Sequence, residues 1–143
     1  MDILLVALHV MSNLVWIGTI ASVGWLTVAA AGQADPARGK LVGELAYALY
    51  KRGAVPAFIA SFAFGVLRLA ADPATYMRLH WFHGKLTFAL VVIGLHHVIG
   101  AKARKAAAGS MQGGKASAIL VGALLVCAFG SVVFVIFKTQ LVR

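Results

Sequence analysis

The segment ILLVALHVMSNLVWIGTIASVGWLTVAAA, residues 3–31, decides the fold because it is long, apolar and free of charged side chains. A transmembrane helix needs about 20 consecutive, mostly apolar residues, and this segment exceeds that length. No basic residue precedes it, and it is too long for the apolar core of a secretory signal peptide. We therefore expect residues 3–31 to form a membrane-spanning helix that the protein retains.

Three further segments of the same kind follow. Residues 54–71, 80–101 and 116–137 are apolar, and connectors rich in Gly, Pro or basic residues separate them. Only 12% of the residues are charged, whereas about a quarter are charged in soluble domains. The sequence thus predicts an all-α fold, an integral membrane four-helix bundle that forms a single domain over residues 1–143.

The connector at residues 32–53 is basic, and its part from 41 to 50 contains few helix breakers. We expect that part to continue as a helix at the membrane interface, where Tyr47 and Tyr50 suit the depth of the headgroups. The only cysteine, Cys127, lies within the last span and is expected to be a small core side chain.

Lys and Arg residues are distributed unevenly among the connectors. The first and third connectors hold eight of them, whereas the other side holds Arg78, Lys138 and Arg143. The positive-inside rule therefore predicts that both basic connectors are cytoplasmic and both termini extracytoplasmic. The net charge of +9 has the same explanation. The expected partner is membrane lipid and not nucleic acid, since no basic helix or aromatic platform forms a docking module.

Several ionisable residues fall inside the predicted spans, where they are costly and by default indicate function. They are His9, Arg68, Lys85, His96 and His97. His9, Asn13 and Trp16 follow one face of the first helix, which we expect to line the bundle interior. His80 and His83 lie at the mouth of the third span.

Lys85 and His96 share one face of the third span, because eleven residues make three turns plus about 20°. Lys85 enters from the same side as His9 and lies at a similar depth. With Arg68 these residues form a cationic group that lacks an intramembrane carboxylate. Such a group suits an anionic or metal-centred guest, and a porphyrin supplies both carboxylates and an iron. Snorkelling of Arg68 and Lys85 to the interface is the alternative.

Other constellations are missing from the sequence. The predicted spans contain no Asp or Glu, so a carboxylate-based proton or sodium path is not expected. The chain has no Cys-x-x-Cys, His-x-His or Met-rich run, so a dedicated copper relay has little direct support. Gly18 and Ser22 form a small-xxx-small step of the kind that favours close helix packing or dimerisation.

Three segments resemble the HemJ-type protoporphyrinogen IX oxidases and the small membrane proteins related to them and to the CopD copper-resistance domain. The matching segments are Leu8-His9 with Trp16-Ile17-Gly18; Tyr47 through Lys51-Arg52 to Pro56; and Trp81 through Leu86 followed by His96-His97 and the basic run at 102–105. The chain also departs from the family pattern. Ala48 stands where the family has a histidine, and the Asn-Glu-x-Pro element before the last span is absent.

The resemblance implies a bundle in a bacterial-type cytoplasmic (inner) membrane that binds haem b, oxidises protoporphyrinogen IX and passes electrons to a respiratory-chain acceptor. His9 and Lys85 match the family's functional pair, and His96 matches its following histidine. The expected cofactor-binding set is His9, Lys85, Arg68, His96 and Trp16, with His9 and His96 as candidate metal ligands. Two alternatives stay open. One is a CopD-like copper-handling protein that uses His9, His83 and His96. The other is a non-enzymatic protein that forms a homo-oligomer or joins a larger membrane complex.

Overall fold

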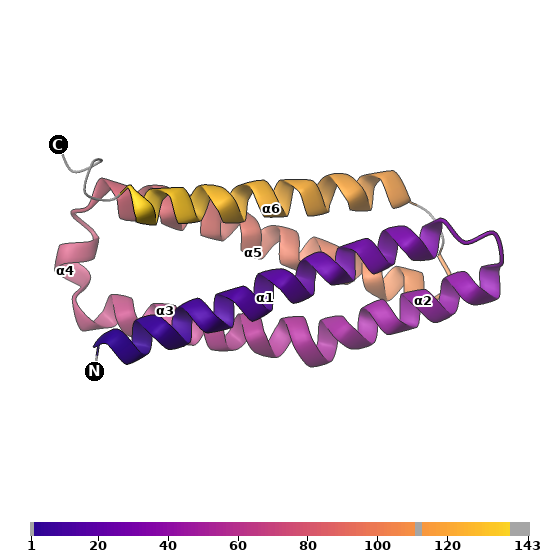
Figure 1. Cartoon of the computed structure of the whole chain (residues 1–143), viewed down its shortest axis with the longest axis horizontal. Helices are drawn as coiled ribbons and strands as arrows, with labels where there is room; N and C mark the ends of the chain where they lie inside the picture. Colours follow the sequence, from indigo (N-terminus) through magenta and orange to yellow (C-terminus); the bar gives the residue numbers. More distant parts are fainter. Residues whose placement is uncertain (1, 111–112, 138–143) are drawn as a thin grey trace.

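The computed structural model describes residues 2–110 and 113–137, and these form helices joined by short turns, without a strand (Figure 1). The elements are α1 (Asp2–Ala31), α2 (Pro36–Leu49), the π-helix η1 (Tyr50–Ala54), α3 (Val55–Ala71), α4 (Pro73–Tyr76), α5 (His80–Ala107) and α6 (Gly114–Ile136). Four helices are long and apolar enough to cross a membrane: α1, the run from α2 to α3, α5 and α6. The predicted all-α membrane bundle is confirmed, and the protein is a multi-pass membrane protein. Lys138 and Arg143, used above for the orientation, lie outside the described residues.

The second spanning helix is longer than predicted, because α2, η1 and α3 follow one another without a break. Asp35 caps its start by accepting a hydrogen bond from the Ala37 backbone N–H at 2.9 Å, and Pro36 occupies the first turn. The predicted helix at 41–50 is present. In the bundle α2 packs against α1 and α5. Glu44, which lies in the predicted connector at 32–53, therefore belongs to the second spanning helix. Its carboxylate is exposed and pairs with Lys40 at 3.8 Å.

The third spanning helix also extends beyond its predicted end. Helix α5 continues to Ala107, because the basic run at 102–105 contains no helix breaker, and Gly109 with a φ of 91° follows it. The added turns pack tightly on α2. A Cβ built on Gly43 of α2 would lie 2.6 Å from the carbonyl oxygen of Ala106, so the two backbones are in close contact.

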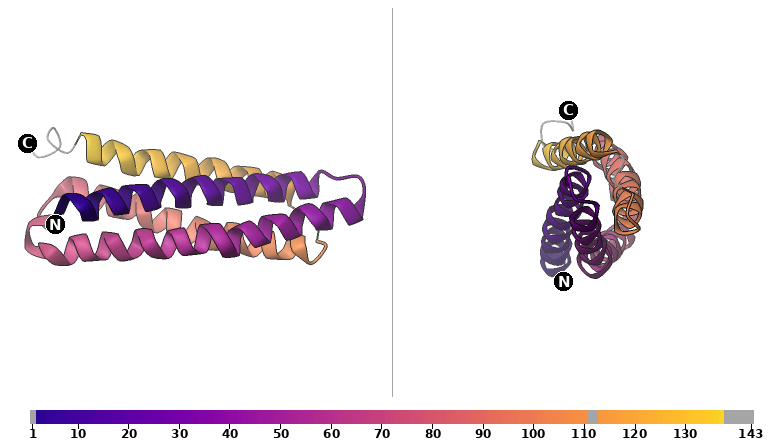
Figure 2. Two further views of the ribbon diagram at one scale, coloured as in Figure 1. Left: turned by 60° about the horizontal axis from the view of Figure 1, so that its bottom comes forward. Right: turned by 90° about the vertical axis from the view of Figure 1, so that its right-hand side faces the viewer.

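Burial is concentrated at the basic end of the bundle. The buried residues of α1 begin at Trp16 and those of α5 at Val92, whereas those of α6 end at Leu124. Helix α3 has one buried residue, Ser61. Helix α3 packs mainly on α1, and α5 on α6 and α2. Toward the end where α1 starts, α3 and α5 diverge, and α4 with its flanking turns joins them (Figures 1 and 2).

The outer surface of the bundle carries many large apolar side chains. Large side chains such as Ile119 and Phe129 are 71% and 70% exposed, which fits contact with membrane lipid. Gly18 belongs to this surface. Nothing lies within 4 Å of a Cβ built there, so the small-xxx-small step at Gly18 and Ser22 packs no helix within the described part of the chain.

Candidate functional site

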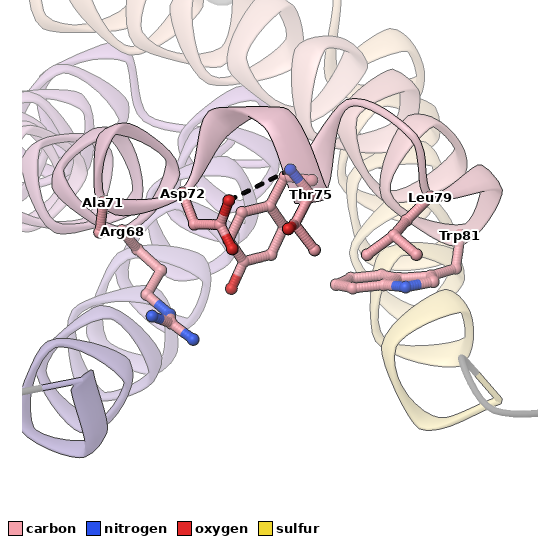
Figure 3. A pocket seen from close by; sticks show the side chains of 7 residues that line it. Arg68, Ala71, Asp72, Thr75, Leu79 and Trp81 are labelled. Atoms are coloured by element: carbon pink, nitrogen blue, oxygen red, sulfur yellow. Dashed lines mark hydrogen bonds between the residues drawn. The ribbon is translucent and has the colours of Figure 1, made fainter.

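A pocket of about 320 Å³ lies where α3, α4 and α5 meet, at the same end as the start of α1 (Figure 3). The Arg68 guanidinium lies over the ring of Tyr76, 5.6 Å from its centroid, and Tyr76 meets Trp81 edge-on at 6.2 Å. Asp72 caps α4 by accepting a hydrogen bond from the Thr75 backbone N–H at 3.2 Å. The pocket therefore combines a cation, an engaged carboxylate and an aromatic wall. Its lining residues are Arg68, Ala71, Asp72, Thr75, Tyr76, Leu79 and Trp81.

The predicted residues His9 and Lys85 lie about one helical turn deeper than this pocket. Gly65 precedes Arg68 by three residues on α3, and Lys85 follows Trp81 by four on α5, so each lies about one turn inward on nearly the same face. The His9 ring packs on Gly65, where a Cβ would lie 2.9 Å from the imidazole Cε1. Lys85 is half-buried. The expected similarity in depth of His9 and Lys85 is thus present.

Hydrogen bonds fix the tautomer of His9. Its Nδ1 lies 2.8 Å from the Ser61 carbonyl oxygen, which can only accept, so Nδ1 carries the hydrogen. Nε2 keeps its lone pair and accepts from the Asn13 side-chain amide at 3.1 Å, and the same amide donates to the His9 carbonyl oxygen at 2.9 Å. A histidine that ligates a metal usually has this arrangement, with its second ring nitrogen donating to a carbonyl or carboxylate.

His96 and Trp16 meet each other in the core, away from His9. The Trp16 indole N–H donates to His96 Nδ1 at 3.1 Å, and the two residues are 5% and 0% exposed. Because Nδ1 accepts, Nε2 carries the hydrogen, and this atom has no hydrogen-bond partner among the described residues. Trp16 lies about two turns further along α1 than His9. In this arrangement His96 presents a hydrogen, and not a lone pair, at Nε2.

Sequence reasoning missed the residues that hold these two histidines. Ser61 and Gly65 lie one turn apart on α3 and make room for the His9 ring. This pair of small residues at a spacing of four was the available signal. The π-helix carries Tyr50 to within 5.1 Å of the His96 ring, and a Cβ on Gly100 would collide with the Tyr50 ring. No local pattern in the sequence identifies that contact.

The copper-binding set proposed as an alternative is not gathered in space. His83 is exposed, and its Nε2 bonds the Met77 carbonyl oxygen at 2.9 Å. His9 lies below the pocket, and His96 lies in the core. Over residues 2–110 and 113–137, no group of three His, Cys, Asp or Glu side chains is arranged to hold a metal ion. His97 is exposed, and Cys127 is partly buried on α6.

Comparisons with protein-family models, with curated proteins and with solved structures found no match to this chain. The geometry of the site and the sequence resemblance are therefore the grounds for a function.

Proposed function

We propose that the protein is a haem b-binding redox protein of the membrane, with the haem held between α3 and α5 at the end of the bundle that carries the pocket. The observation that carries this proposal is the tautomer of His9. Its Nδ1–H donates to the Ser61 carbonyl at 2.8 Å, so Nε2 carries the lone pair, which accepts from the Asn13 amide at 3.1 Å and would bind a metal in its place. His9 would hold the haem iron through Nε2, and Asn13 would then retain only its bond to the His9 carbonyl oxygen at 2.9 Å.

Positive charge supports the same placement. Lys85 lies at a depth similar to that of His9, and Arg68 lines the pocket, so the two cations could pair with propionates, or Lys85 could be a second ligand of the iron. Tyr76 and Trp81 supply aromatic surface beside Arg68. His96 is left out of this ligand set, because its Nδ1 accepts the Trp16 indole hydrogen.

Bound haem would supply one-electron redox chemistry, with a potential that depends on the axial ligands and on the apolar surroundings. The protein residues bind, orient and shield it. Oxidation of protoporphyrinogen IX, with electrons passed to a respiratory-chain acceptor, is the activity that the resemblance to the HemJ-type family adds. The copper-handling alternative lacks a gathered ligand set, and membership of a larger complex remains the alternative for a protein without cofactor.

The proposal is tested by an absorption spectrum of the detergent-purified protein before and after dithionite, with a pyridine haemochrome assay. We expect a Soret band that shifts on reduction and close to one haem b per chain. A colourless protein that takes up no added haemin would overturn the proposal. A Lys85→Met variant with full haem occupancy and an unchanged spectrum would remove Lys85 from the site.

We further infer that the basic end of the bundle faces the cytoplasm of a bacterial-type inner membrane, which places the pocket on the outer side. The exposed cations of this end include Arg38, Lys51, Arg52, Arg104 and Lys115. Alkaline phosphatase fused after residue 79 is expected to be active, and the same enzyme fused after residue 110 inactive. The reverse pattern would invert the assignment.

A further inference from the structure

The His96 side chain is fully buried, yet its Nε2–H lacks an acceptor among the described residues. Buried polar groups in native proteins nearly always have a partner, and an exception calls for an explanation such as a water or a ligand. The direction of this donor is fixed, because the Trp16 indole occupies Nδ1 at 3.1 Å. The site therefore presents one oriented N–H group and calls for a hydrogen-bond acceptor.

The walls of this site are flat and aromatic. Phe58 and Tyr50 lie 5.0 and 5.1 Å from the His96 ring, and Trp16 meets it edge-on at 5.8 Å. Tyr50 begins the π-helix, an element that is rare and frequently found at functional sites. The ring of His96 contacts those of Trp16, Tyr50, Phe58 and His97, so a second imidazole lies beside it.

One side of the site leads toward the membrane. Phe58 is partly buried, and its ring lies 5.9 Å from that of His97, which is exposed. Phe58 and His97 both contact the His96 ring, at 5.0 and 5.1 Å between ring centroids, so the side of the imidazole that they cover is the less buried one. Helices α3 and α5 make little direct contact, and the Phe58 ring of α3 lies against the His96 imidazole of α5.

We propose that His96 is the hydrogen-bond donor of a binding site for a membrane quinone. A quinone is neutral, lipid-soluble and planar, and its carbonyl oxygen only accepts hydrogen bonds, so each of its properties matches a feature of the site. The quinone carbonyl bonds the Nε2–H of His96, and the ring displaces Phe58 and lies against Tyr50. This inference goes beyond haem binding and does not depend on it.

The test uses the intrinsic fluorescence of Trp16 in haem-free protein. Replacing Trp25 and Trp81 by Phe leaves Trp16 as the only tryptophan. The probe is decylubiquinone titrated into the protein in detergent micelles, and the readout is the midpoint of quenching. We expect saturable quenching, with the midpoint raised about tenfold or more in His96→Phe, which loses the hydrogen bond.

Two further variants separate binding from general effects. His80→Phe, an exposed histidine at the start of the same helix, is expected to keep the midpoint. His96→Gln keeps an N–H donor and is expected to restore part of the affinity, which also covers poor folding of His96→Phe. Quenching that never saturates, or an equal midpoint in His96→Phe and the parent, would overturn the proposal. A haemochrome assay on the parent protein reports haem binding separately, so the two proposals can fail independently.

Discussion

Replacing His9 by alanine is expected to remove haem from the protein, with affinity reduced by more than about 100-fold. Loss of a residue that only orients a metal ligand weakens binding by about 10- to 100-fold, and His9 is assigned as the ligand itself. The measurement is haem per chain by pyridine haemochrome, in protein purified from cells supplied with excess haem precursor. His80→Ala is the matched control, because His80 is an exposed histidine at the same end of the bundle.

Gly65→Ala tests the same assignment without touching the imidazole. The added methyl group would lie 2.9 Å from His9 Cε1, so the ring has to shift and its bond to the Ser61 carbonyl weakens. We expect this variant to bind haem with an altered absorption spectrum. If both His9→Ala and Gly65→Ala retain full occupancy and the parent spectrum, the iron is held elsewhere and the assignment fails.

Replacing Gly43 by alanine is expected to destabilise the bundle by about 3 kcal/mol, the upper part of the range for overpacking. The new Cβ would lie 2.6 Å from the Ala106 carbonyl oxygen, and backbone atoms cannot move aside as a flexible side chain does. Helices α2 and α5 must then separate, which also loosens the packing around them. Unfolding of the protein in micelles by increasing SDS, followed by circular dichroism, gives the change in stability.

Gly94→Ala on α5 is the control for this substitution. No atom lies within 4 Å of a Cβ built there, so the methyl group meets only the surroundings of the bundle. We expect unchanged or slightly increased stability, since alanine favours a helix more than glycine does. Equal stability of Gly43→Ala and the parent would mean that α2 and α5 do not approach each other in this way.

The spanning helices could be predicted because the hydrocarbon thickness imposes a length and a composition that a single sequence displays. Their ends could not. The basic residues at 38–52 and 102–105 were assigned to connectors, yet helix continues through both, since long cationic side chains can remain on a helix and reach the headgroups. Charge marks the end of the hydrocarbon region, whereas caps and breakers mark the end of a helix.

For the site, the sequence could predict only which residues share a face of the same helix. The spacing of His9, Asn13 and Trp16 placed them on one face, and in the structure Asn13 bonds His9 while Trp16 is buried. Contacts between helices depend on which helices pack together and on how far each is shifted along the bundle axis. Trp16 and His96 are 80 residues apart in sequence, so their hydrogen bond was beyond any local pattern. The hydrogen bond from His9 to the Ser61 carbonyl could not be predicted either, because every residue has a backbone carbonyl and the sequence does not mark this one.

The uneven burial along the bundle has a thermodynamic consequence. Segments with few buried apolar contacts open at lower free energy than the core, so backbone amides of the half beginning at Asp2 should exchange with solvent faster than those near Ile20 and Ile99. A molecule that binds only the closed form of this half raises the free energy of opening by RT ln(1 + [L]/Kd). The half that holds the candidate haem site is therefore the part of the fold whose opening would be suppressed most when its ligand is bound.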